Sequence, residues 1–154
     1  MSNNVFFGNY DLNCFEIAFD PDKYATRYYE KAFKLPSGVQ AEILIKQPNI
    51  NDKEIIDDTL KTNIVPAKTP CLLHADEVKT YKFWFDETNT DKAPEPNYFH
   101  GVTKRTRVYD LFPPEKYTIL VLITNENGDG VEWVSLRKPN GTVGANRIFI
   151  PVQI

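Results

Sequence analysis

The sequence predicts an all-β protein, mainly an antiparallel β-sandwich, with one or two short helices in its N-terminal half. Three observations lead to this prediction. Residues 117–124 form the most hydrophobic run, and their β-branched and aliphatic side chains indicate a strand buried over most of its length. Pro113 and Pro114 precede that run, where they remove two backbone donors and force a corner. About seven to nine short apolar runs, separated by turn signals, complete the sandwich pattern.

The composition is that of an ordinary globular protein. Of the 154 residues, 42% are hydrophobic and 25% are charged, which argues against an intrinsically disordered chain. The aromatic content of 13% suits β-structure, and the formal net charge of -3 gives no basis for general nucleic-acid binding. We therefore expect a single β-sandwich domain over residues 1–154, with residues 1–38 as a candidate N-terminal extension and residues 48–69 as a long excursion between strands.

The first residues and the cysteines bear on the cellular compartment. Residues 1–8 contain no basic region and no long apolar stretch, so we expect no signal peptide. No window approaches ~20 apolar residues, which predicts a protein with no membrane span and no membrane partner. Synthesis in a reducing cytoplasm follows. It favours two buried thiols, Cys14 and Cys71, over the one disulfide that the count allows.

Alternating apolar residues predict two strands in the N-terminal half. Residues 12–19 are expected as the first strand, because Phe15, Ile17 and Phe19 fall on one face at a period of two. Residues 39–46 are expected as another strand after the turn at residues 35–38. Its apolar face consists of Val39, Ala41, Ile43 and Ile45.

Residues 22–33 fit either a short helix or a strand. Asp20 can cap a helix whose first position is Pro21, and Tyr24 and Tyr28 would then share one helical stripe. The same tyrosines also fit the alternation of a strand. The capping residue and the lysines near the end of the segment favour the helix.

Residues 48–69 are the least regular stretch. Asn51 and Glu54 have the spacing of a capping box, and Ile55 and Leu60 fit one face of a helix. The alternative is a long excursion between strands, and long loops are often where a module meets its partner.

The C-terminal half contains most of the predicted strands. A polar, proline-containing loop is expected at residues 86–97, and a tight hairpin turn at residues 125–130. The strands are expected at residues 71–75, 78–85, 98–109, 117–124, 131–137 and 147–154.

The proline corner resembles a known structural family. The spacing Leu111-x-Pro113-x-x-x-Tyr117-x-Ile119-x-Val121 is similar to the corner between strands E and F of fibronectin type III and related immunoglobulin-like domains. The resemblance implies that the leucine fills the core and that the tyrosine hydroxyl bonds back to upstream backbone. It also implies an immunoglobulin-like sandwich. A generic β-turn between two strands is the alternative.

No motif in the sequence predicts catalysis, a cofactor or a metal. Residues 125–130 begin like a calcium loop, but Leu136 stands where the bidentate glutamate would be needed, so a hairpin loop is favoured. Cys71 and His74 have a zinc-like spacing, with only Cys14 and His100 as further soft ligands, and we interpret them as structural. We therefore expect no enzymatic activity, no cofactor and no metal site.

Two groups of residues are candidates for binding a partner. Arg105 and Arg107 are expected on one strand face close to Tyr109. A solvated outer face of the sheet is favoured there, and a grip on an acidic partner or a phosphate is the alternative. Exposed aromatic residues would stack on sugars or anchor a protein interface, although core positions are favoured for most of these residues. These aromatic candidates are Trp84, Trp133, Tyr28 and Tyr29.

A sandwich with no active-site set favours a non-enzymatic structural or interaction protein. By analogy of fold, virion accessory proteins of tailed phages are a good match, since capsid-decoration, head–tail joining and fibre-attachment proteins often use immunoglobulin-like sandwiches. The expected partner is a protein of a larger assembly or a second copy of the chain, not nucleic acid or membrane. A carbohydrate-binding or adhesive module, with a glycan as partner, is the alternative.

Overall fold

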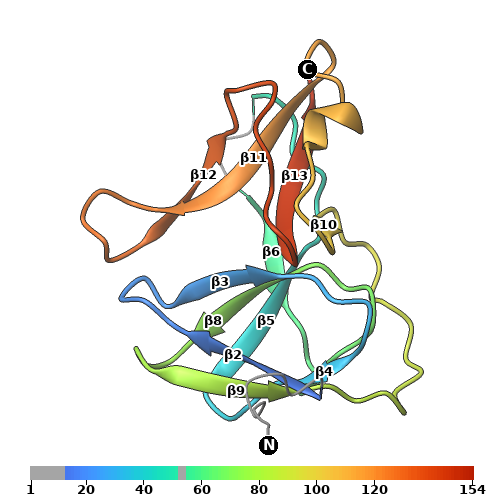
Figure 1. Ribbon diagram of the computed structural model, residues 1–154, viewed down its shortest axis with the longest axis vertical. Coiled ribbons are helices and arrows are strands. Elements are labelled where there is room, and N and C mark those ends of the chain that lie inside the picture. Colours follow the sequence, from blue (N-terminus) through green and yellow to red (C-terminus); the bar gives the residue numbers. More distant parts are fainter. Residues whose placement is uncertain (1–12, 52–54) are drawn as a thin grey trace, which may run out of the picture.

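All the sheets formed by the described residues are antiparallel. The computed structural model describes residues 13–51 and 55–154, and it divides into a lower, N-terminal half and an upper, C-terminal half (Figure 1). Within these residues there is no α-helix, and one short 3-10 helix, η2 (Val108–Asp110), is present. The all-β antiparallel sandwich prediction is confirmed and is compatible with an immunoglobulin-like arrangement, whereas the predicted short helices are wrong.

The N-terminal half is a sandwich of two layers. In the first layer the strands follow the order β3 (Tyr24–Arg27), β8 (Cys71–Ala75), β5 (Val39–Leu44) and β6 (Asp57–Thr59). The second layer consists of two pairs, β2 (Cys14–Ala18) with β9 (Thr80–Trp84) and β4 (Phe33–Lys34) with β7 (Ile64–Val65). A bridge between Phe33 and Phe85 joins the two pairs into one layer.

Aromatic rings fill the space between these two layers. Phe83 and Phe33 are fully buried, and Phe83 stacks on Phe15 with ring centroids 4.7 Å apart. Ile17 and Phe19 are buried in the same cluster, so the predicted apolar face of the first strand is confirmed. Burying one large aromatic side chain contributes about 2 to 3 kcal/mol, which makes this cluster the main stabilising feature of the N-terminal half.

The C-terminal half is a four-stranded sheet packed on that sandwich. Its strands follow the order β10 (His100–Val102), β13 (Arg147–Gln153), β11 (Tyr117–Thr124) and β12 (Val131–Ser135). Ile148, Ile150 and Val152 on β13 pack in one cluster with Leu44 and Leu72 of the N-terminal half. The opposite face of the sheet buries a separate cluster beside η2, made of Val102, Val108, Ile119, Val143 and Phe149.

The contact between the halves also uses a reciprocal pair of hydrogen bonds between Tyr28 and Asn146. Tyr28 N donates to Asn146 O at 2.9 Å, and Asn146 Nδ2 donates back to Tyr28 O at the same distance. The Tyr28 ring lies directly against Gly101, where an added Cβ would sit 2.2 Å from Tyr28 Cγ. Glycine is therefore required at this position for the two halves to approach so closely.

Residues 22–33 do not form the favoured helix. Asp22 Oδ1 accepts a hydrogen bond from Tyr24 N, and Lys23 has a φ of 65°, a left-handed conformation that ends any helical path. The chain then forms β3, which pairs along its whole length with β8. The local capping signal is overridden because pairing with β8 satisfies the backbone and buries the segment against both halves.

The described parts of residues 48–69 also contain strands instead of a helix. β6 pairs with β5, and β7 pairs with β4. The capping box proposed for Asn51 and Glu54 falls partly on residues 52–54, which lie outside the described residues.

The strand predicted over residues 98–109 is shorter than expected. β10 ends at Val102, whose carbonyl accepts a hydrogen bond from Asn146 N, and Thr106 next forms an isolated bridge with Val143. The chain then turns through η2 to the proline corner. The prediction failed because the segment crosses from one partner strand to another and never forms a continuous ladder.

The corner differs from the fibronectin pattern at both diagnostic residues. Leu111 is 61% exposed and does not fill the core. The bridging hydroxyl belongs to Tyr109 and not to Tyr117: Tyr109 Oη donates to Leu136 O at 2.9 Å and accepts from Ile119 N at 3.2 Å. Leu136 N donates to Ile119 O, so the hydroxyl occupies the place of the second hydrogen bond of this strand pair.

β11 has the predicted bounds but not the predicted burial. Ile119 is fully buried, whereas Ile123 is 42% exposed. The far ends of β11 and β12 extend past the packed part of the sheet (Figure 1). The loop that joins them is the predicted hairpin, closed by a hydrogen bond from Asn125 N to Gly130 O at 2.8 Å.

The two thiols are not joined by a disulfide. Cys71 is fully buried on β8, and its burial raises the pKa of the thiol to about 12. Cys14 is only partly buried, so the prediction of two buried thiols holds for Cys71 alone.

Candidate functional site

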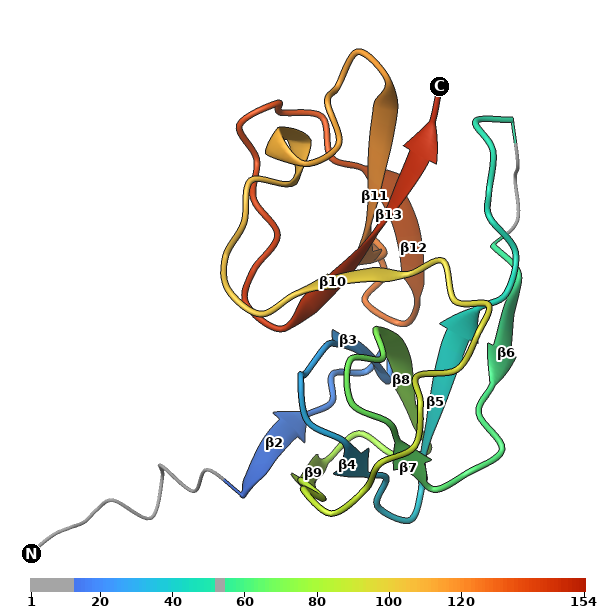
Figure 2. The same cartoon turned by 90° about the vertical axis from the view of Figure 1, so that its right-hand side faces the viewer.

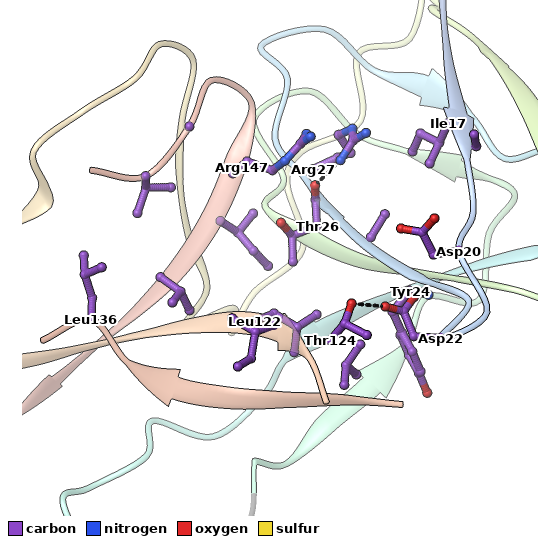
Figure 3. Close-up of a pocket in the computed structure, with 18 of the residues that line it drawn as sticks. Ile17, Asp20, Asp22, Tyr24, Thr26, Arg27, Leu122, Thr124, Leu136 and Arg147 are labelled. Atoms are coloured by element: carbon purple, nitrogen blue, oxygen red, sulfur yellow. Dashed lines mark hydrogen bonds between the residues drawn. The ribbon is translucent and has the colours of Figure 1, made fainter. Parts of the chain in front are cut away.

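A cleft of about 440 Å³ lies between the two halves. One wall is formed by β2, β3 and the turn between them, and the other by β11, the start of β12 and residues 142–148 (Figure 3). Apolar side chains from both halves line it, among them Ile17, Leu122 and Ile148. The volume is in the range that accommodates a small organic ligand.

Two arginines meet at one end of this cleft. Arg27 is the last residue of β3 and Arg147 is the first residue of β13. Figure 3 shows their guanidinium groups directed toward one another. Arg27 Nη1 donates to Thr26 O at 2.8 Å, which holds the half-buried side chain in place, while Arg147 is exposed.

The electrostatic environment of these arginines is unfavourable. Burial lowers the pKa of Arg27, and the like charge of Arg147 lowers it further, whereas Tyr29, through its charge and a side-chain hydrogen bond, offsets part of this effect. The ion pairs within the described part of the chain are Lys31–Glu87, Lys79–Glu77 and Arg107–Asp110, so neither guanidinium of the cleft has a carboxylate within 4.0 Å there. Two positive charges are therefore held together without a neighbouring carboxylate among residues 13–51 and 55–154.

The acidic residue at the other end of the cleft has a structural role. Asp22 is 7% exposed. Its Oδ2 accepts a hydrogen bond from Thr124 Oγ1 at 2.6 Å, and its Oδ1 accepts one from Tyr24 N at 3.0 Å (Figure 3). One carboxylate oxygen thus joins the turn to the end of β11, and the other joins it to the start of β3.

The arginines singled out in the sequence do not share a strand face. Arg105 and Arg107 lie in the loop between β10 and η2. Arg105 Nη1 contacts Thr142 Oγ1 at 3.5 Å, whereas Arg107 Nη2 pairs with Asp110 Oδ1 at 3.3 Å. With Tyr109 engaged in the strand contact, the structure does not bring these three residues together on one strand face, so their expected placement is wrong.

The candidate aromatic residues separate into one exposed and three packed side chains. Trp84 on β9 is 46% exposed, with Lys82 Nζ 5.1 Å from its ring centroid, so the core interpretation of Trp84 is wrong. Trp133 stacks on Phe99 with centroids 5.5 Å apart. Tyr28 packs in the cluster between the halves, and Tyr29 packs on the aromatic core of the N-terminal sandwich.

The zinc-like pair and the remaining histidine are placed in packing environments. Cys71 and His74 project to opposite faces of β8. Cys71 belongs to the aromatic core, whereas the His74 ring stacks on the Tyr24 ring with centroids 4.4 Å apart. His100 contacts the rings of Phe112 and Phe149, and burial lowers its pKa.

A surface outside the cleft is formed by the connection between β5 and β6. Its described residues, 45–51 and 55–56, rise beside the C-terminal sheet (Figure 2). Ile45, Ile50 and Ile56 on this connection are 37%, 50% and 41% exposed, and we call them the isoleucine surface. Ile45 N donates to Ile56 O at 3.2 Å, and Gln47 Nε2 donates to Pro151 O at 3.2 Å, so the connection is tied to itself and to β13.

Comparison with known proteins gives no assignment. No family model, no curated protein and no solved structure matches this chain. In the part of the chain that the structure describes, no helix has the length and apolar character needed to cross a membrane.

Proposed function

We propose that this chain is a non-enzymatic structural or interaction protein, an accessory component of a larger assembly. The isoleucine surface carries the proposal. Isoleucine is among the residue types most often buried, and three of them gathered on one projecting connection favour a protein contact over a solvated loop. The hydrogen bonds from Gln47 and Ile45 fix this connection, which reduces the entropy lost when a partner orders it.

The environments of the histidines support a role without catalysis. His74 is stacked on a tyrosine and His100 is packed between aromatic rings. A general base needs a neighbouring nucleophile or substrate proton within hydrogen-bonding reach. The two imidazoles are instead used as packing groups.

The assembly that we propose is the virion of a tailed phage, with the protein made in the cytoplasm and then incorporated. Support for this finer proposal is an analogy of fold, because antiparallel sandwiches are common among capsid-decoration, head–tail joining and fibre-attachment proteins. The partner is accordingly a virion protein or a second copy of the chain, and neither nucleic acid nor membrane.

Sedimentation velocity of the full chain over a wide concentration range tests this function. We expect the sedimentation coefficient to increase with concentration, or the protein to co-sediment with particles from its source. Ile50→Lys is expected to abolish the association. Val78→Lys is the matched control, because Val78 is 52% exposed but lies away from the isoleucine surface, between β8 and β9.

Two results would contradict the proposal. One is a monomer at every concentration that also fails to co-sediment with particles. The other is association that Ile50→Lys and Val78→Lys weaken equally, which would indicate nonspecific contact through any exposed apolar side chain.

The exposure of Trp84 favours a second candidate, a carbohydrate-binding or adhesive module. A tryptophan ring open to solvent on the outer face of β9 is a platform on which a sugar can stack. Binding on a glycan array that is lost in Trp84→Ala and kept in Trp133→Phe would support it, because Trp133 is engaged with Phe99. An array without any bound glycan would remove this candidate.

A further inference from the structure

We propose that Arg27 and Arg147 form a binding site for the carboxylate or phosphate group of a small organic anion in the cleft between the two halves. This site goes beyond the proposed function, because it is distinct from the isoleucine surface and binds a small molecule.

The geometry suits a planar or tetrahedral anion. Each guanidinium presents several N–H donors in a fixed fork that matches two oxygens of a carboxylate or phosphate. Arg27 uses one Nη1 hydrogen for Thr26 O and also hydrogen-bonds the Tyr29 side chain, which orients the donors that remain for an anion. Because Arg147 comes from the other half and points to the same place, an anion between them would be held from two sides (Figure 3).

The missing counter-charge indicates a ligand. Structural arginines that are partly buried are ordinarily paired with a carboxylate. Here Asp20 and Asp22 line the same cleft, yet neither lies within 4.0 Å of a guanidinium nitrogen, and Asp22 is occupied by Thr124 and Tyr24. The fold therefore holds two like charges close together, and a bound anion would relieve the repulsion between them.

The lining of the cleft gives the ligand class. A free phosphate ion would fill only a small part of about 440 Å³. Apolar side chains such as Val121, Leu122 and Ile148 line part of the remaining cleft, and threonines line another part. An organic anion could therefore place its carboxylate or phosphate between the arginines and an apolar body against these side chains.

Thermal unfolding of the full chain with simple anions tests the site. Sodium phosphate, sodium acetate and sodium butyrate are compared with sodium chloride at equal ionic strength. We expect either phosphate or the carboxylates to raise the midpoint of thermal unfolding in a saturable way. If the site prefers carboxylates, butyrate should raise the midpoint more than acetate does. Phosphate also stabilises proteins in general, so the stabilisation of the wild-type protein by each anion is compared with the stabilisation of a variant by the same anion.

Arg147→Gln is the informative variant and Arg137→Gln is its control. Arg147→Gln should raise the midpoint of thermal unfolding in chloride, because it removes the repulsion on Arg27, and should weaken anion binding by about tenfold or more. A merely structural arginine would instead lose stability in chloride. Arg137 is exposed after β12, and its replacement should leave both properties unchanged.

Nuclear magnetic resonance makes the test independent of the stability of any variant. During the titration of wild-type protein, the side-chain Nε–Hε signals of Arg27 and Arg147 should shift together and saturate. Failure of either signal to shift with phosphate, acetate or butyrate would overturn the proposal. Equal stabilisation of wild type, Arg147→Gln and Arg137→Gln by every anion would also overturn it.

Discussion

Replacing Glu42 by Gln should make the protein more stable at neutral and alkaline pH. Glu42 lies on β5 and Asp57 on the neighbouring strand β6, where the register places Asp57 opposite Leu44. Burial, followed by the charge of Asp57 and a hydrogen bond with it, raises the pKa of Glu42 from 4.5 to about 7. The fold thus favours the protonated acid at this position.

The way in which stability changes with pH follows from the raised pKa of Glu42. Because the pKa of Glu42 is higher in the folded protein than in the unfolded chain, the folded protein binds more protons between pH 4.5 and about 7. The contribution to the free energy of unfolding is fully present below about pH 4.5. It is lost as the pH rises through about 7, where Glu42 ionises beside Asp57.

The magnitude is limited by solvent screening. At about 1.4 kcal/mol for each pKa unit, the full shift in the pKa of Glu42 would change the free energy of unfolding by about 3 kcal/mol. Since the Glu42 side chain is only partly buried, we reduce this to about 1 kcal/mol. Glu42→Gln keeps the shape of the protonated acid and its ability to donate to Asp57, so it should gain about 1 kcal/mol over wild type at pH 8 and nothing at pH 4.

Urea unfolding followed by tryptophan fluorescence measures this difference at pH 4, 6, 7 and 8. Glu126→Gln, in the exposed hairpin loop between β11 and β12, is the matched control and should show no such gain. If Glu42→Gln were less stable than wild type at pH 8, or if its gain were the same at every pH, the reasoning would be refuted.

Two further predictions concern the packing of the C-terminal half. Gly101→Ala should lower the free energy of unfolding by about 1 to 3 kcal/mol, because the new Cβ would overlap the Tyr28 ring, and the loss should be much smaller in a Tyr28→Ala background. Tyr109→Phe should cost about 1 to 3 kcal/mol, since it leaves the amide of buried Ile119 without the hydroxyl that bridges it to Leu136 O. Tyr117→Phe is the control for the latter, and an equal loss in both tyrosine variants would show that the bridging hydroxyl has been wrongly assigned. Urea unfolding at a fixed pH measures all of these variants.

Strands that alternate cleanly and end at strong turn signals could be predicted from the sequence. The face formed by Phe15, Ile17 and Phe19 was predicted because period two places them on one side of any strand. The bounds of β11 were predicted because prolines precede it and a turn rich in asparagine and glycine follows it. In both cases the signal is local.

Features that depend on distant partners could not be predicted. The capping signal at Asp20 favoured a helix, but β3 gains its hydrogen bonds from β8, which a local pattern does not reveal. Arg27 and Arg147 are far apart in the sequence and meet only because the two halves pack together. No spacing rule joins them, and Arg27 lay within the segment interpreted as a helix.

We propose that this protein acts through contacts made by the isoleucine surface. Hydrogen–deuterium exchange of the full chain, compared between dilute protein and either concentrated or particle-bound protein, tests whether this surface is covered. We expect slower exchange of the amides at residues 45–51 in the associated state, with unchanged exchange in the loop at residues 125–130. Association that leaves exchange at residues 45–51 unchanged would contradict it.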